Sequence, residues 1–364
     1  MYSCKKPYTP DISEAVNSIL VVEGTIAVGA DVENHFLLSR LRILLDTSLN
    51  YPEPGAAVRI ESESGQNWTL QENADGNYSA NLSLTPNGKY KLKITTDGGK
   101  QYETGFLEVK STPAIDSVTW EDNDDLNIYV HSHDPSNNTK YYRWEFRETW
   151  EYHASFETNL RFENGQIIFL SPADQTYACW SNSASSSIII GNTTALSEDK
   201  VSYQLIQKLP RPDVRASFKY SILVRQYGLP EQAYEFWSIL RKNTELTGSL
   251  FDPQPSQLPG NISCINDPAE PVIGFISAGM VAEKRIYILN KDLVNWSSNV
   301  DSTCKPILPE LVSESIAIMV GDNSYGPVYY WPSIIPPEHL AVAKKNCMDC
   351  RSKGGTTTKP PYWQ

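Results

Sequence analysis

Short runs in which apolar and polar residues alternate, separated by Asp-Gly pairs, limit what this chain can fold into more than any other feature. Val58-Arg59-Ile60 and Tyr90–Ile94 place apolar side chains at every second position, which is the pattern of strands with one buried face. Asp75-Gly76 and Asp97-Gly98 lie beside such runs and supply the positive-φ positions that tight hairpins require. The sequence therefore predicts antiparallel β structure in this part of the chain.

Strand patterns continue beyond Ser111-Thr112-Pro113, which we interpret as a domain boundary. The later predicted strands are Asp116–Trp120, Leu126–His131, Tyr141–Phe146, Gln166–Leu170, Ser187–Ile190 and Phe218–Arg225. A chain of 364 residues is too long for one typical core and favours two domains. We expect a mainly β protein, in which an immunoglobulin-like N-terminal β sandwich precedes a larger sandwich or barrel-like domain with one prominent helix. The expected parts are a tether at 1–15, the sandwich at 16–111, the larger domain at 112–345 and a Cys-x-x-Cys tail at 346–364.

The helix is predicted near 230–247. Pro230 suits its first turn, where a missing N–H is tolerated, and Gly248 lies where a left-handed C-terminal cap would be. Ala233, Trp237 and Leu240 share one face at helical spacing. We expect this face to be buried along Trp237 and Leu240.

Charge and hydropathy exclude two classes of protein. The net charge is −12, whereas nucleic-acid binding needs clustered Lys and Arg, so no nucleic-acid partner is expected. Apolar stretches such as Ser187–Ile190 are strand-sized, far below the roughly 18 residues of a transmembrane helix.

Cys4 indicates where the protein resides. The small residue Ser3 precedes it, and a polar segment that begins with Lys5-Lys6-Pro7 follows, as at the cleavage site of a bacterial lipoprotein whose leader has been trimmed. Acyl chains on this cysteine would anchor the protein to a membrane, because each buried CH₂ contributes roughly 0.8 kcal/mol. A stray cysteine in a disordered terminus is the alternative.

The other cysteines suit an exported protein with disulfides. Cys264 and Cys304 flank two strand-like runs, and we predict a disulfide between them. Cys347 and Cys350 could close on each other, or one of them could reach Cys179. Five cysteines besides Cys4 leave one thiol unpaired or paired outside the chain.

Three sets of residues are candidates for binding. His131 and His133 lie two residues apart at a strand end, on one side of the strand, as a metal site would require. We favour the alternative of two solvated histidines at an exposed strand end, and we expect no metal. Trp150 and Tyr152 follow the strand alternation and are predicted to be exposed aromatics for a partner. Tyr362 and Trp363 end a tail that carries the Cys-x-x-Cys pair, and we predict that they dock on the second domain or on a partner.

The run that precedes these aromatics alternates sharply. Tyr142, Trp144 and Phe146 share one face of the predicted strand, while Arg143, Glu145 and Arg147 share the other. The charged face suits a network between sheets or at a partner surface. No nucleophile elbow, His-Glu-x-x-His or phosphate-binding glycine loop is present in the sequence, so we expect neither enzymatic activity nor a cofactor.

Several blocks resemble a Bacteroidota outer-membrane lipoprotein family of unassigned function. The blocks are Tyr142–Trp150, Cys179-Trp180, Tyr220–Tyr227, Ala233–Trp237 with Gly260-Asn261-Ile262, and Cys347–Arg351 with Pro360–Trp363. The segment from Pro54 to Ile94 also resembles the prealbumin-like sandwich of carboxypeptidase regulatory-type domains. Genes of the lipoprotein family commonly lie beside TonB-dependent outer-membrane transporters.

The resemblance implies a lipid-anchored outer-membrane protein that assists a TonB-dependent transporter by capturing substrate, gating or bracing, without catalysis. A structural or adhesive surface protein is the first alternative, and a surface glycan or peptide hydrolase is the second. We expect the chain to face the cell surface. Lys5-Lys6 departs from the acidic residues that often follow the lipidated cysteine of surface-exposed relatives, so the periplasmic face stays open. The sequence does not identify the ligand.

Overall fold

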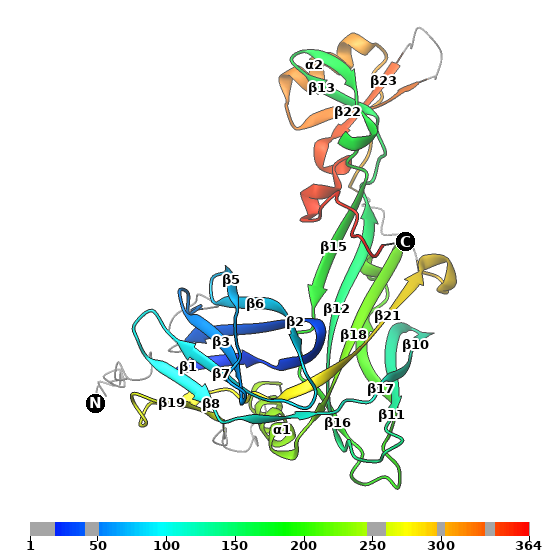
Figure 1. Ribbon diagram of the computed structural model, residues 1–364. Helices are drawn as coiled ribbons and strands as arrows, with labels where there is room; N and C mark the ends of the chain where they lie inside the picture. The colour runs from blue at the N-terminus through cyan, green and yellow to red at the C-terminus, as the bar shows by residue number, and fades with distance from the viewer. Residues whose placement is uncertain (1–18, 41–50, 246–259, 297–302, 332–338, 364) are drawn as a thin grey trace, which may run out of the picture.

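The computed structural model describes residues 19–40, 51–245, 260–296, 303–331 and 339–363 of the chain. It is mainly β, as predicted, and consists of an N-terminal sandwich, a second sandwich and a small tip lobe at the far end of the second sandwich (Figure 1).

The N-terminal sandwich consists of two layers. One sheet contains, in spatial order, β20 (Val272–Ile273), β1 (Leu20–Gly24), β2 (Ile26–Arg40), β6 (Asn77–Leu84) and β5 (Gln71–Ala74). The other contains β4 (Asn67–Thr69), β3 (Ala57–Ser62), β7 (Lys89–Thr95), β8 (Gln101–Thr104) and β19 (Ile262–Cys264), with β9 (Leu107–Lys110) also beside β7.

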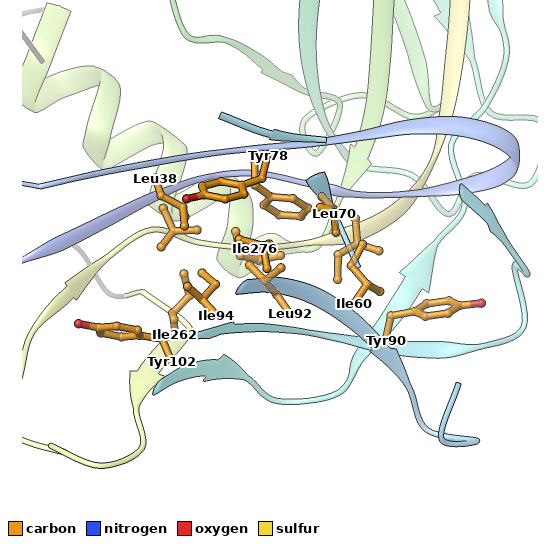
Figure 2. Packing of buried hydrophobic residues seen from close by; sticks show 14 of the residues in the cluster. Leu38, Ile60, Leu70, Tyr78, Tyr90, Leu92, Ile94, Tyr102, Ile262 and Ile276 are labelled. Atoms are coloured by element: carbon orange, nitrogen blue, oxygen red, sulfur yellow. The ribbon is translucent and has the colours of Figure 1, made fainter. Parts of the chain in front are cut away.

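The predicted alternation builds the core of this sandwich. Ile60, Leu92 and Ile94 are buried, and Figure 2 shows them on the inner side of their sheet, with Leu38 and Tyr78 on the opposite sheet. The Asp75-Gly76 turn joins β5 to β6, and Gly76 has φ +70°. After β7 the positive φ belongs to Gly99 instead of Gly98, because the turn extends one residue further than the Asp-Gly pair suggests.

Residues far along the chain complete this first core, which the predicted domain boundary did not foresee. β19 pairs with β8, β20 pairs with β1, and Ile276 lies buried between the two sheets (Figure 2). The N-terminal sandwich therefore includes residues 262–278 as well as the expected first hundred or so.

The second sandwich also has two sheets. The larger contains β15 (Ala178–Ala184), β12 (Tyr141–His153), β18 (Lys219–Leu229) and β21 (Ala278–Leu289), and β16 (Ile189–Asn192) continues the edge beside β15. The smaller contains β10 (Ile115–Asn123), β11 (Asp125–His133) and β17 (Lys200–Leu209). Their core includes Ile128, Val130, Trp144 and Val224.

β21 connects the two sandwiches. Its first residues pair in parallel with β2 and β9, and the remainder pairs antiparallel with β18. In Figure 1 this strand runs diagonally from one sandwich into the other. The outer face of the β12–β18–β21 sheet thereby lies against the outer face of β1 and β2.

The predicted helix is α1 (Glu231–Glu245), and its apolar face packs on Ile190, Tyr227 and Leu229 of the second sandwich. Trp237 is 7% exposed, which confirms the predicted burial, and Leu240 is half-buried. Gly248 lies outside the described residues.

The tip lobe has a core of its own around Leu160, Met319 and Leu340. It contains β13 (Leu160–Glu163), β14 (Gln166–Phe169), α2 (Val312–Gly321), β22 (Tyr325–Trp331) and β23 (His339–Lys344). Short 3₁₀ segments are η2 (Pro172–Asp174), η3 (Val214–Ala216), η4 (Asn290–Asp292), η5 (Lys345–Cys347) and η6 (Cys350–Lys353). In the part of the chain that the structure describes, neither α-helix has the length and apolar character to cross a membrane.

Candidate functional site: a charged cleft between the two sandwiches

A cleft of about 290 Å³ lies where the outer faces of the two sandwiches meet. The N-terminal sandwich contributes Glu23, Glu33, His35 and Leu37, among others. The second contributes Arg143, Glu145, Arg147, Arg225, Tyr227, the serines 185–187, Ile188 and, from α1, Trp237. Most of these side chains are charged or polar, unlike the apolar cores on either side.

Strand alternation places these residues in the cleft. On β2, Asn34, Phe36 and Leu38 are buried in the N-terminal core, so residues 33, 35 and 37 face outwards, because successive side chains on a strand point to opposite sides. On β12, Tyr142, Trp144 and Phe146 are buried, and the charged residues between them face the cleft. This outcome confirms the predicted charged face and shows that it lies between two sheets.

Two ion pairs hold charges at the boundary between the sandwiches. Arg147 Nη2 lies 3.0 Å from Glu33 Oε2, and Arg225 Nη1 lies 3.6 Å from the same oxygen. Arg225 Nε also lies 2.7 Å from Glu283 Oε1. Glu33 of the first sandwich therefore neutralises cations on two strands of the second.

Arg143 occupies the aromatic wall of the cleft. Its guanidinium carbon lies 3.9 Å from the ring centre of Trp237 and 5.9 Å from that of Tyr227, and the group forms an ion pair with Glu145. The Tyr227 hydroxyl donates to Glu145 Oε2 at 3.1 Å. Burial raises the pKa of Tyr227, and the nearby Glu145 carboxylate raises it further, so the hydroxyl stays protonated and continues to donate.

Glu23 differs from the other carboxylates of the cleft, because it has no ion-pair partner among the described residues. Glu23 lines the cleft and is exposed to solvent. Desolvation raises the pKa of the Glu23 carboxyl above its ordinary value. Arg143 and His35 oppose the increase, and Glu145 adds to it.

Family and structural comparisons place this geometry in context. The profile of a family described as a domain of unknown function, DUF4249, matches residues 5–285. The chain belongs to the DUF4249 family. Every residue that lines the cleft falls inside the matched segment, whereas α2, β22 and β23 of the tip lobe follow it. None of the curated proteins matches this chain.

Two solved structures that match this DUF4249 chain are remote from it in sequence and in shape. A protein described as membrane-anchored from Corynebacterium diphtheriae is 8% identical, with a TM-score of 0.17, over 58% of this chain and 54% of that one. A chitinase from Bacillus thuringiensis is 9% identical, with a TM-score of 0.15, over 52% and 28% respectively. The DUF4249 chain thus spans about half of the first protein, and such TM-scores support no argument about fold or function.

The disulfides of the DUF4249 chain differ from the predicted Cys264–Cys304 bond. The bonds are Cys179–Cys350 and Cys304–Cys347, and Cys264 is a buried free thiol. The prediction was wrong because the strands between Cys264 and Cys304 do not pair with each other. The 12 residues of β21 carry the chain about 40 Å towards the tip lobe, and a disulfide cannot span that distance.

The two bonds answer the question that Cys347 and Cys350 left open. They do not close on each other, and Cys350 reaches Cys179, one of the predicted alternatives.

A large cavity of about 410 Å³ in the tip lobe is lined partly by Met348, Asp349 and Arg351 of the same segment. Asp349 and Arg351 pair with each other at 2.7 Å.

The two predicted exposed aromatics are covered. Tyr152 is 4% exposed, and its hydroxyl donates to the backbone carbonyl of Cys350 at 3.0 Å. Trp150 is half-buried against the core of the second sandwich. The prediction for Tyr152 was wrong because β12 continues to His153, so the strand alternation and the C-terminal tail together cover the residue.

The C-terminal aromatics dock on the second sandwich. Trp363 is 4% exposed and donates its indole N–H to Glu151 Oε2 at 3.0 Å. The Tyr362 hydroxyl lies 3.0 Å from Thr149 Oγ1, and its ring lies beneath the Arg285 guanidinium at 3.9 Å. Of the two predicted docking places, this is the second domain.

The candidate histidines do not converge. His131 hydrogen-bonds through both ring nitrogens, to Thr119 Oγ1 at 2.8 Å and to the Tyr203 N–H at 3.3 Å, while His133 pairs with Asp116 at 2.7 Å. Within the described residues, no three His, Cys, Asp or Glu side chains gather as metal ligands would. Cys4 lies outside the described residues.

Sequence reasoning missed Glu23, Glu33 and His35. No candidate site residue was predicted on β1 or β2, the strands that carry them. The alternation of apolar and polar residues from 33 to 38 could have predicted that Glu33 and His35 face away from the core. A register shift between Gly29 and Val32 interrupts this alternation nearer the start of β2.

Proposed function

We propose that this DUF4249 chain is a lipid-anchored outer-membrane binding protein that captures a small ligand for a TonB-dependent transporter and catalyses no reaction. The observation that carries the proposal is the cleft between two sandwiches, because ligand sites occur preferentially at domain interfaces and combine apolar walls with a few fixed polar groups. The first sandwich, with its resemblance to prealbumin-like regulatory domains, forms one wall of this cleft.

The disulfides support the proposed location. The Cys179–Cys350 bond ties the C-terminal tail to the second sandwich, and the Cys304–Cys347 bond joins the two ends of the segment that contains α2, β22 and β23. Stable disulfides are typical of oxidising compartments outside the cytosol. Residues Ser3-Cys4-Lys5 supply the proposed lipidation site. Acyl chains on Cys4 would hold the protein at the outer membrane, and the resemblance to the Bacteroidota lipoproteins supports this location.

The tip lobe offers a surface for the transporter. Large apolar side chains are exposed there, and Trp331 is 58% exposed. The others are Leu308, Leu311, Val320 and Tyr329. Exposed apolar patches of this kind commonly mark contacts with a second protein.

Native co-purification tests the proposal. The chain with its native leader is extracted from membranes in mild detergent, and its partners are identified by mass spectrometry, with Cys4→Ala as the matched control. We expect a large TonB-dependent β-barrel to be retained by the native chain and lost when Cys4→Ala releases it to the soluble fraction. Recovery of the membrane-bound chain without a barrel would favour a structural or adhesive surface protein instead.

A further inference from the structure

We infer that the cleft between the sandwiches binds a small monocationic ligand, a protonated amine or guanidinium with a compact apolar body, and that the Glu23 carboxylate is its counter-ion. This inference rests on the proposed function as a binding protein and specifies the chemistry of the ligand.

The charge balance of the cleft leaves one carboxylate for a ligand. Each of the three arginines already pairs with a glutamate, Arg143 with Glu145, Arg147 with Glu33 and Arg225 with Glu283. Glu283 lies outside the lining of the cleft, and with it as the partner of Arg225, Glu23 is the carboxylate left over among the described residues of this site. An anionic ligand would have to break an existing ion pair, whereas a cation would gain a partner without displacing one.

Buried carboxylates elsewhere in the chain are already paired, whereas Glu23 is exposed and has no ion-pair partner among the described residues. Glu148 pairs with Arg215 at 2.7 Å and accepts from the Tyr220 hydroxyl at 2.6 Å. Glu270 pairs with Lys100 and accepts from the Tyr102 hydroxyl at 2.6 Å. The Glu148 and Glu270 carboxylates are therefore not available to a ligand, whereas the exposed Glu23 carboxylate can pair with a bound cation without losing a protein partner.

The remaining walls set the size and shape of the ligand. About 290 Å³ corresponds to roughly ten water molecules, which is close to the volume of an amino-acid derivative or a single sugar ring. Leu37, Ile188 and the edge of Trp237 would contact an apolar body, and Ser186 and Ser187 would meet hydroxyl or amide groups at the rim. The Trp237 ring face is already occupied by Arg143, so Glu23, not cation–π stacking, provides the recognition of charge.

Calorimetric titration with matched probe pairs tests the inference and separates two sources of the amine. Leucinamide with N-acetylleucinamide represents amino-acid derivatives, and glucosamine with N-acetylglucosamine represents amino sugars. In at least one pair we expect binding of the amine and at least about tenfold weaker binding of its neutral N-acetyl partner. Equal binding within both pairs, or no binding of either amine, would overturn the inference.

Variants of the protein assign the effect to Glu23. Glu23→Gln should weaken binding of the amine by at least about tenfold, the usual worth of one hydrogen bond to a charged group. Glu63→Gln removes the same charge at an exposed position outside the cleft and should bind as the native protein does. If Glu23→Gln fails to fold, Glu23→Asp keeps the charge on a shorter side chain and should bind less tightly than the native protein. Unchanged affinity in a folded Glu23→Gln variant would contradict the assignment. If only Glu23→Asp folds, unchanged affinity in that variant would contradict it.

The outcome is independent of the transporter experiment. Amine binding without a co-purified barrel would leave the ligand inference intact and refute the transporter role. A co-purified barrel with no amine binding would support the transporter role and refute the ligand inference.

Discussion

Arg147 of the second sandwich and Glu33 of the first form an ion pair of 3.0 Å across the boundary between them. The pair closes one side of the cleft and helps to fix the distance between its walls. Because Glu33 also lies 3.6 Å from Arg225, one glutamate of β2 connects to two strands of the opposite sheet.

Glu33→Gln should affect the geometry of the cleft more than the stability of the fold. The side chains of Arg147 and Glu33 are 49% and 31% exposed, and exposed pairs of this kind contribute about 1 kcal/mol or less. Urea denaturation should therefore show a loss of about 1 kcal/mol or less in low salt, and a smaller loss in 0.5 M salt. A loss above about 2 kcal/mol, independent of salt, would mean that the pair is more desolvated than the structure indicates.

Trp237→Ala should destabilise the protein by about 3–5 kcal/mol, because it leaves a cavity between α1 and the second sandwich and removes the surface on which Arg143 packs. Glu235→Ala, at an exposed position of the same helix, is the control and should cost less than 1 kcal/mol. Equal effects of the two variants in chemical denaturation would show that the apolar face of α1 is not buried.

Peptide mapping without reduction should recover the Cys179–Cys350 and Cys304–Cys347 bonds and a free Cys264. Removing the second bond with Cys304→Ser and Cys347→Ser together should cost about 4 kcal/mol, since the chain-entropy relation assigns that amount to a loop of 43 residues. A Cys264–Cys304 peptide would contradict the structure.

Trp363→Phe should destabilise the protein by an amount that depends on pH, which a loss of packing alone would not produce. Hydrogen bonds from His153 and from the Trp363 indole lower the pKa of Glu151, against the effect of desolvation. A carboxyl whose pKa is lowered on folding stabilises the fold at every pH above its pKa in the unfolded chain. This contribution is lost as the pH falls through the pKa of the folded state.

The variant lacks the indole donor, so its deficit in stability should be about 1.5 kcal/mol or more at pH 7 and should shrink below about pH 4. Melting temperatures of both proteins across this range provide the measurement. A deficit that does not change with pH would indicate that Trp363 acts by packing only.

How far the sequence predicted this structure depended on the range of the interactions involved. Alternation in Tyr142–Phe146 correctly predicted a buried aromatic face and a charged face, because that signal is local. The same approach failed for Cys264. The neighbours of this residue depend on the pairing of β19 with β8, which lies more than 150 residues earlier in the sequence. Local periodicity contains no information on such pairing.

The cleft itself was only half predictable. Its second wall followed from the alternation of Arg143, Glu145 and Arg147, whereas the wall that faces it depends on the parallel pairing of β21 with β2. Only that pairing brings Glu23 opposite Arg143. The docking of Trp363 was anticipated from the clamped tail, but its partner Glu151 lies more than 200 residues away and could not be identified from the sequence.

The pH dependence of amine binding tests the cleft most directly. Leucinamide keeps its charge between about pH 4 and 6.5, whereas the Glu23 carboxyl, whose pKa desolvation raises above its ordinary value, loses its charge as the pH falls. The groups that face Glu23 are His35 on β2 and Arg143 and Glu145 on β12.

Affinity measured by calorimetry should therefore increase with pH in the native protein. In Glu23→Gln the increase should be much smaller, because only the neighbouring groups can still titrate. An affinity that is constant with pH in the native protein, or a slope that Glu23→Gln leaves unchanged, would contradict a ligand site built around Glu23.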